Sequence, residues 1–230
     1  NTSGSITSTV SANTTSGFSI VSYTGNGTGG STIGHGLGVT PDFIILKSRS
    51  GVHNWYVYHK SYGVGYAKLN LTDTFSSATD VFPVAPTSSV FTIASDASIN
   101  TNTHNYIAYC FAEKKGFSKF GSYTGNGSTD GTFIYTGFKP AFTIVKPSSF
   151  ADNWEIYDNK RNTFNTGSTK RLKANSSEAE SDSPRVDFLS NGFKLRGTTG
   201  FPNTNGETFI YMCFAENPLV SSAGVPCTAR

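Results

Sequence analysis

The chain has 230 residues, of which 36% are hydrophobic, 14% charged and 13% aromatic, and its formal net charge is +3. This apolar content suffices for one large or two small globular domains, so a disordered chain is excluded. The low charged fraction, together with abundant serine, threonine and glycine, excludes long surface helices and favours an all-β protein. The basic residues are scattered, which argues against a nucleic-acid or polybasic membrane surface.

The first 16 residues are rich in serine, threonine and asparagine, and we interpret them as a leader. Residues 5–10 alternate between polar and apolar side chains, which is typical of a strand, so the leader is expected to add a strand to a sheet edge. Residues 18–22 alternate again before Gly25-Asn26-Gly27, a sequence that favours a hairpin-type turn.

Six short strands are predicted between residues 17 and 115. Residues 42–47 form an apolar run after a proline, as expected of a strand that is covered on both faces. The other five strands are expected at residues 18–22, 54–59, 67–71, 89–94 and 106–112. Strands of this length, separated by turn residues, predict an antiparallel sandwich-like unit.

The sequence then repeats itself. The hexad Ser22-Tyr23-Thr24-Gly25-Asn26-Gly27 recurs unchanged at residues 122–127, and three further motifs recur in the same order at nearly constant spacing. These motifs are residues 41–47 with 140–146, Asn54-Trp55 with Asn153-Trp154, and 107–113 with 210–216. Four collinear matches predict two tandem homologous units of about six strands each. The predicted boundaries are 1–16 for the leader, 17–115 and 116–217 for the two units, and 218–230 for a C-terminal tail.

Three cysteines, Cys110, Cys213 and Cys227, form no closely spaced pair. This pattern indicates neither a disulfide framework nor a zinc knuckle. Cys110 and Cys213 lie in apolar strand patterns, so we expect both to be buried and unpaired in equivalent places. No apolar run is long enough to span a membrane, and no signal-peptide pattern occurs at the start. Because the sequence begins with Asn1, we interpret it as part of a longer polypeptide.

The two tryptophans, Trp55 and Trp154, occupy matching positions and have two interpretations. Their ring faces would serve as platforms for sugar stacking. One large ring per unit is also what a sandwich core needs as filler, and we favour core or half-buried packing.

His53 and His59 flank Trp55, which raises the question of a metal pair. No cluster of carboxylates or thiols accompanies them, so we do not expect a metal site. The second unit has Asp152 and Asp158 at the matching places, so neither histidine is needed for a fold common to both units. Such unmatched positions are candidates for divergent surface function.

His35 lies within a series of closely spaced glycines and is expected at an exposed loop tip. The series lacks the Lys-Ser/Thr ending of a phosphate-binding loop, so we interpret it as turns. Five residues are candidates for ligand binding, because they are expected in loops or because the other unit has a different residue at the matching place. They are His35, His53, Asn54, Asp152 and Asn153. The sequence predicts no catalytic residues, no metal ligands and no cofactor.

Four motifs carry a resemblance to a known family: Gly34-His35-Gly36-Leu37-Gly38-Val39-Thr40-Pro41, Asn54-Trp55, Tyr106-Ile107-Ala108-Tyr109-Cys110-Phe111-Ala112-Glu113 and Tyr211-Met212-Cys213-Phe214-Ala215-Glu216. They resemble a repeated β-rich domain of virion structural proteins in tailed bacteriophages, notably phages of marine bacteria and cyanobacteria. The resemblance extends from Ser5 to Arg230. That family has no established catalytic residues, so the resemblance implies a context and no active site.

The resemblance implies a non-enzymatic protein on the exterior of a phage particle, as a tail fibre, spike or appendage domain that contributes to host attachment. The expected partners are copies of itself, with a trimer favoured, other virion proteins and a host surface glycan; neither nucleic acid nor membrane insertion is expected. The expected contact loops are residues 29–38, 51–54 and 148–153. Two alternatives stay open: a capsid or tail decoration protein, and a polysaccharide-degrading tailspike enzyme with carboxylates from distant strands.

Overall fold

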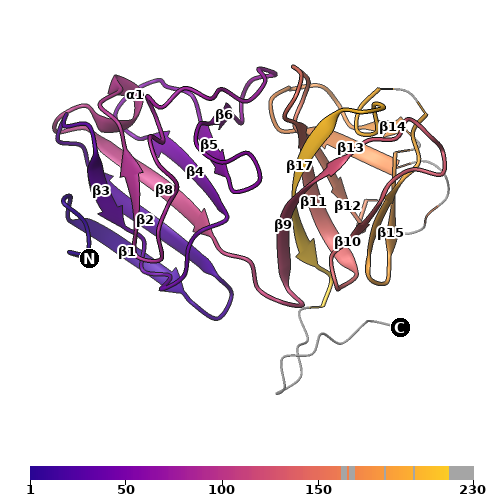
Figure 1. Cartoon of the computed structure of the whole chain (residues 1–230), viewed down its shortest axis with the longest axis horizontal. Helices are drawn as coiled ribbons and strands as arrows, with labels where there is room; N and C mark the ends of the chain where they lie inside the picture. The colour runs from indigo at the N-terminus through magenta and orange to yellow at the C-terminus, as the bar shows by residue number, and fades with distance from the viewer. Residues whose placement is uncertain (162–164, 166–168, 184, 199, 218–230) are drawn as a thin grey trace. The chain divides into compact units, whose positions relative to one another are not determined.

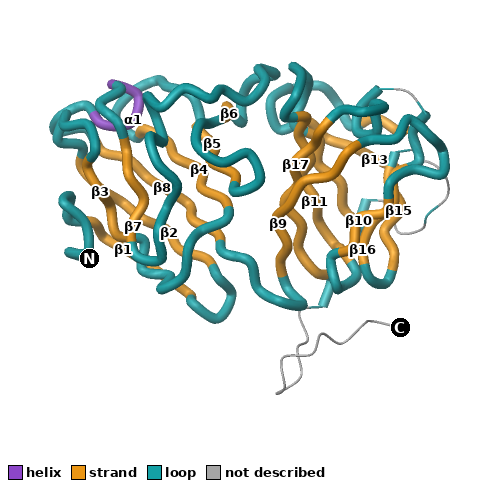
Figure 2. Tube along the Cα trace, viewed as in Figure 1, coloured by secondary structure: helices purple, strands orange, loops and turns teal. Residues whose placement is uncertain are grey.

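The computed structural model describes residues 1–161, 165, 169–183, 185–198 and 200–217. In these residues regular structure is almost entirely strand, and the one helix, α1 (Ala97–Asn100), has 4 residues (Figure 2). The predicted all-β fold class is therefore confirmed. No helix in the described ranges is long and apolar enough to cross a membrane.

The contacts divide the chain into two compact units. Unit 1 consists of Asn1–Asn70 and Phe75–Glu113, and unit 2 consists of Leu71–Thr74 and the chain from Lys114 onward. The boundary at Lys114 lies close to the one that the repeats predict. The division is not a simple tandem one, because of Leu71–Thr74. In the sequence this segment lies between the two parts of unit 1, but by its contacts it belongs to unit 2.

Unit 1 contains a six-stranded antiparallel sheet in the order β1-β2-β8-β4-β5-β6 and a two-stranded sheet of β3 and β7 (Figure 1). The strands are β1 (Ser8–Asn13), β2 (Phe18–Thr24), β3 (Ser31–Gly34), β4 (Phe43–Ser48), β5 (Tyr56–His59), β6 (Ala67–Lys68), β7 (Val90–Ile93) and β8 (Asn105–Phe111). The leader supplies β1, which pairs with β2 at the sheet edge from Ser8↔Tyr23 to Asn13↔Phe18.

Unit 2 contains a six-stranded antiparallel sheet in the order β14-β13-β12-β11-β17-β9 and a three-stranded sheet in the order β10-β16-β15. Its strands are β9 (Ser118–Thr124), β10 (Phe133–Tyr135), β11 (Pro140–Pro147), β12 (Glu155–Asp158), β13 (Thr169–Lys173), β14 (Ser181–Ser183), β15 (Val186–Leu189), β16 (Gly192–Leu195) and β17 (Thr208–Ala215).

The two units share one strand order. β2-β8-β4-β5-β6 in unit 1 corresponds to β9-β17-β11-β12-β13 in unit 2, and β3-β7 corresponds to β10-β16. Among the described residues, each unit also has strands of its own, β1 in unit 1 and β14 and β15 in unit 2. A duplicated unit requires a shared order of this kind.

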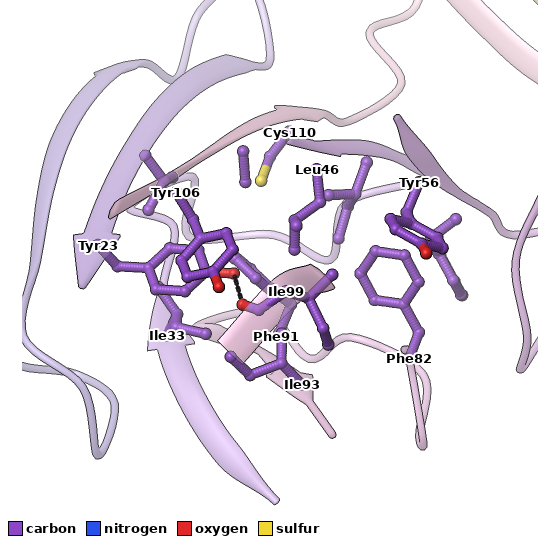
Figure 3. Close-up of a cluster of buried hydrophobic side chains, with 14 of the residues drawn as sticks. Tyr23, Ile33, Leu46, Tyr56, Phe82, Phe91, Ile93, Ile99, Tyr106 and Cys110 are labelled. Atoms are coloured by element: carbon purple, nitrogen blue, oxygen red, sulfur yellow. Dashed lines mark hydrogen bonds between the residues drawn. The ribbon is translucent and has the colours of Figure 1, made fainter. Parts of the chain in front are cut away.

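In unit 1 the core consists of side chains from both sheets and from α1 (Figure 3). Tyr23 of β2 and Tyr106 of β8 stack with ring centroids 5.2 Å apart. The Tyr23 hydroxyl donates to the Ile99 carbonyl at 2.8 Å, so this buried polar group has a partner at the helix.

Unit 2 repeats this arrangement around Tyr123. Its ring stacks on Phe209 of β17 at 5.2 Å, and its hydroxyl donates to the Pro202 carbonyl at 2.9 Å. Burial raises the pKa of both Tyr23 and Tyr123 well above the usual value, so both rings stay neutral packing groups.

The predicted hairpin at Gly25-Asn26-Gly27 is wrong. β2 pairs with β1 and β8, whereas the segment after it leads to β3 in the other sheet. The Gly25 N–H donates to the His104 carbonyl and the Gly27 N–H to the Asn100 carbonyl, both at 2.8 Å. The backbone N–H groups of Gly25 and Gly27 are therefore satisfied by the last residue of α1 and the loop beyond it, and not by a facing strand.

Candidate functional site

The loop before β5 is held by one asparagine from beyond β6. Asn70 Oδ1 accepts a hydrogen bond from the Trp55 N–H at 2.9 Å, and Asn70 Nδ2 donates to Asn54 Oδ1 at 2.9 Å. The Leu69 N–H also donates to the Trp55 carbonyl at 2.9 Å. We call Asn54, Trp55 and Asn70 the unit 1 clamp.

Unit 2 has the same clamp, formed by Asn153, Trp154 and Asn175. Asn175 Oδ1 accepts from the Trp154 N–H at 2.8 Å, and Asn175 Nδ2 donates to Asn153 Oδ1 at 2.8 Å. The Ala174 N–H donates to the Trp154 carbonyl at 2.9 Å. The candidate residues Asn54 and Asn153 thus have equivalent structural partners.

A lysine from the preceding strand completes each clamp. Lys47 of β4 donates from Nζ to the His53 carbonyl at 2.7 Å, and Lys146 of β11 donates to the Asp152 carbonyl at 2.7 Å. Each lysine binds the backbone of residue 53 or 152 and not its side chain. The unit therefore tolerates histidine in one copy and aspartate in the other.

The two clamps differ in exposure. Trp154 is 1% exposed and Lys146 is 0% exposed, whereas Trp55 is 37% exposed beside the half-buried Lys47. Lys47 Nζ lies 5.9 Å from the Trp55 ring centroid, within the range of a cation–π interaction. Trp154 therefore packs in the core, as predicted, whereas Trp55 lies at the surface.

His35 is not exposed at a loop tip, and that prediction is wrong. The side chain is 0% exposed, Nδ1 accepts from the Leu37 N–H at 3.3 Å, and Nε2 lies 3.2 Å from the Thr87 carbonyl. Burial lowers its pKa, so the neutral ring is favoured. The expected contact loop at residues 29–38 instead contains β3 and several buried side chains, including Ile33.

The two histidines near Trp55 have separate environments. His59 is fully buried at the end of β5, where its ring packs edge-on against Phe43 and its Nδ1 accepts from the Ser61 N–H at 3.1 Å. His53 is half-buried in the loop. Within the described ranges, no group of three or more histidine, cysteine, aspartate or glutamate side chains gathers as metal ligands would.

A second pair of asparagines, which the sequence reasoning missed, holds the loops after β2 and β9. Asn100 Oδ1 accepts from the Asn26 N–H at 3.0 Å, and Asn100 Nδ2 donates to the carbonyls of Thr28 at 2.8 Å and Ala94 at 3.0 Å. The side chain is 0% exposed. We call Asn100 the unit 1 staple.

Asn203 is the staple of unit 2 and is also 0% exposed. Its Oδ1 accepts from the Asn126 N–H at 3.0 Å, and its Nδ2 donates to the carbonyls of Ser128 at 2.9 Å and Gly197 at 2.8 Å. A signal was present in the sequence. Asn-Thr-Asn occurs at residues 100–102 and 203–205, with the same spacing as Cys110 and Cys213.

Glu155 is a buried carboxylate that the sequence reasoning also missed. It is 2% exposed, accepts a hydrogen bond from the Tyr157 hydroxyl and forms an ion pair with Arg171. Burial raises its pKa, against the opposing effects of Tyr157 and Arg171. Unit 1 has Tyr56 at the matching place, so this charge is a divergent feature of unit 2.

Cys110 and Cys213 are buried, free thiols, as predicted. Burial raises the pKa of each to about 12, and the Thr143 hydroxyl donates to Cys213 Sγ at 3.3 Å. Neither is therefore a nucleophile at neutral pH. Cys227 lies outside the described residues.

Comparison with known proteins adds a family and no activity. No curated protein and no solved structure matches the chain. One family model, described as "Domain of unknown function (DUF7483)", matches residues 1–218, a range that includes both clamps and both staples. The chain therefore belongs to the DUF7483 family of domains of unknown function.

Proposed function

We propose that the chain is a non-enzymatic structural component of a tailed-phage virion, as a tail fibre, spike or appendage domain that contributes to host attachment. The resemblance of the motifs at residues 34–41 and 106–113 supports this context. The observation that carries the proposal is the duplicated set of clamps and staples, which hold loops of both units in place.

Loops held in this way suit a particle component. The staple side chains of Asn100 and Asn203 are fully buried, and each one fixes two loops through backbone groups. Hydrogen bonds inside a protein are screened by salt far less than exposed ion pairs are. A loop that is already ordered also loses little conformational entropy when it binds a partner. Both properties favour a rigid module outside the cell.

The proposed contact surface includes the loop before β5. Val52 is fully exposed there, and Trp55 exposes 37% of its surface. The partners in this proposal are further copies of the chain, with a trimer favoured, other virion proteins and a host surface glycan. An exposed aromatic ring with polar neighbours, such as Trp55, suits a glycan.

Labelling of intact particles tests the proposal. Antibodies raised against the purified 230-residue chain should label the tail appendages of the phage that encodes it, and should block adsorption of that phage to its host. Label on the capsid, with adsorption unchanged and particle stability reduced on loss of the chain, would indicate a decoration protein. Absence of the chain from purified particles would overturn both roles, and release of oligosaccharides from host capsule would indicate the enzyme.

A further inference from the structure

The lysine–tryptophan pair of the clamps occurs twice, and only the copy in unit 2 is covered. Trp154 and Lys146 are almost completely buried, whereas Trp55 is 37% exposed and Lys47 is half-buried. Their local hydrogen bonds are equivalent, since each lysine donates to the carbonyl six residues further along the chain, at 2.7 Å. Lys146 differs in that it makes a second hydrogen bond, to the Thr72 carbonyl.

In unit 2 a short segment, Leu71–Thr74, contacts Lys146, and it belongs to that unit by its contacts. The Thr72 carbonyl accepts a hydrogen bond from Lys146 Nζ at 3.1 Å, and the Thr74 hydroxyl donates to the Ser148 carbonyl at 2.9 Å. Burial lowers the pKa of Lys146, and the negative charges of Asp152 and then Asp73 oppose this effect by favouring the protonated lysine. The cap is therefore a short acidic segment that supplies one carbonyl and one nearby carboxylate.

This cap has a defined place in the sequence of the repeat. Leu71–Thr74 directly follows Asn70, the asparagine of the unit 1 clamp. The matching asparagine of unit 2 is Asn175, and residues 176–179 follow it as Ser-Ser-Glu-Ala. Asp73 and Glu178 are both the third residue after a clamp asparagine, so the second loop carries the same sign of charge at the same position.

We propose that residues 176–179 of a second copy of this chain cap the exposed Lys47–Trp55 pair, by binding Lys47 as Leu71–Thr74 binds Lys146. Charge complementarity supports this occupant, because Lys47 is cationic and the Glu178 side chain is 66% exposed. Glu178 pairs with Lys173 at 2.6 Å and keeps that pair. Its charge acts on Lys47 from nearby, as the charge of Asp73 acts on Lys146.

The proposed contact is head-to-tail, because the loop and the Lys47–Trp55 pair are different surfaces of one chain. Such a heterologous contact builds a ring where the rotation closes and a filament where it does not. This assignment does not depend on the proposed virion role.

Two surface changes with matched controls test the contact by sedimentation of the full chain over a range of concentrations. Trp55→Ser and Glu178→Gln are each expected to weaken self-association at least about tenfold. Val84→Ser removes a 51% exposed valine elsewhere in unit 1 and should leave association unchanged. Asp182→Asn removes another exposed, lysine-paired carboxylate of unit 2 and should change it little.

Mixing distinguishes a head-to-tail contact from any symmetric one. Chains carrying Trp55→Ser keep the intact loop at residues 176–179, and chains carrying Glu178→Lys keep the intact Lys47–Trp55 pair. Each variant alone should be monomeric, while the mixture should form a one-to-one dimer and nothing larger. Acrylamide quenching adds a local readout, because Trp154 is buried and Trp55 should become protected as the wild-type concentration rises.

The contrary results are equally specific. A wild-type chain that stays monomeric at every concentration, or that associates as strongly with Trp55→Ser, overturns the proposal. A monomeric mixture beside an associating wild type overturns the head-to-tail arrangement. Protection of Trp55 by host polysaccharide in a monomeric chain overturns the assignment to a second copy and makes Trp55 a glycan platform. None of these results depends on where the chain lies in a particle, so the proposed function fails or stands separately.

Discussion

Asn203 accepts a hydrogen bond from the backbone N–H of Asn126 at 3.0 Å, and this contact joins loops 77 residues apart in the sequence. Asn100 and Asn26 make the same contact in unit 1, at the same distance. The staples therefore occupy corresponding places in two separate cores. Each one adds the hydrogen bonds of a remote side chain to the local bonds of its loop, such as those from the Thr28 and Ser128 N–H groups to the preceding asparagine side chains.

Removing the unit 2 staple should destabilise unit 2. Asn203→Ala leaves the Asn126 N–H and two carbonyls without their partner inside the protein, at about 1–3 kcal/mol for a buried group left unsatisfied. Of these three contacts only the one with the Gly197 carbonyl is fully buried, so we expect a loss of about 1–3 kcal/mol in the free energy of unfolding. Urea unfolding followed by Trp154 fluorescence, in a Trp55→Phe background, reports unit 2 alone.

The control for this variant lies two residues away. Asn205 is exposed, so Asn205→Ala should change the same free energy by no more than about 0.5 kcal/mol. If both variants lost the same free energy of unfolding, the hydrogen bonds of Asn203 would contribute no more than an exposed asparagine in the same loop.

Gly125 should not tolerate a side chain, for a steric reason. A Cβ at this position would lie 2.3 Å from the Thr204 carbonyl oxygen, which is backbone and cannot rotate away. Gly125→Ala should therefore destabilise unit 2 by about 1–3 kcal/mol or more.

Gly206 is a contrasting case, because it has φ +77° and a Cβ at this position would meet open space. Gly206→Ala should cost only the backbone strain, about 1 kcal/mol. A thermal unfolding series that ranks Gly206→Ala as the worse variant would contradict this account.

The strand pattern was predictable where apolar side chains alternate or form an uninterrupted run. β4 and β8 have such patterns, since both lie inside the larger sheet with buried positions along their length. β3 was missed because it has four residues, of which Ile33 is the one large apolar side chain, and glycines surround it. The glycine-rich sequence predicts turns, but the segment forms a strand in which Ile33 is buried in the core.

The site was only partly predictable, for a different reason. The repeat placed Asn54-Trp55 and Asn153-Trp154 in equivalent positions, as their clamps require. The distant segment Leu71–Thr74, which contacts Lys146 in unit 2, could not be connected with this site by any local pattern. The staples were missed because asparagine in a loop suggests a turn former, while Asn100 and Asn203 act as buried cross-links between loops.

The two buried thiols should be chemically silent in the folded chain. Burial raises the pKa of Cys110 and Cys213 to about 12, so almost no thiolate forms near neutral pH. In a Cys227→Ser background, we expect no reaction with Ellman's reagent at pH 8 until urea is added, and then two reactive thiols per chain. Rapid labelling of either thiol in the native chain would show that its strand opens readily.

Lys146 gives unit 2 a pH dependence of known sign. Burial lowers its native pKa to about 8, whereas a lysine in the unfolded chain keeps a pKa of 10.5. Between these values the unfolded state binds more protons than the native state. The free energy of unfolding should therefore rise with pH over this window, by up to about 1.4 kcal/mol per pH unit.

Lys146→Met removes this contribution while keeping a long side chain in the site. The measurement is the difference in unfolding free energy of unit 2 between wild type and Lys146→Met, from pH 7 to pH 10. The buried cysteines act in the opposite direction above pH 9, because their native pKa is raised, but they are common to both chains and cancel in the difference. The wild type should gain on the variant as pH rises above 8. A difference that stays constant across the range would show that Lys146 is as well stabilised in its charged form inside unit 2, by the carbonyls of Asp152 and Thr72, as it is in water.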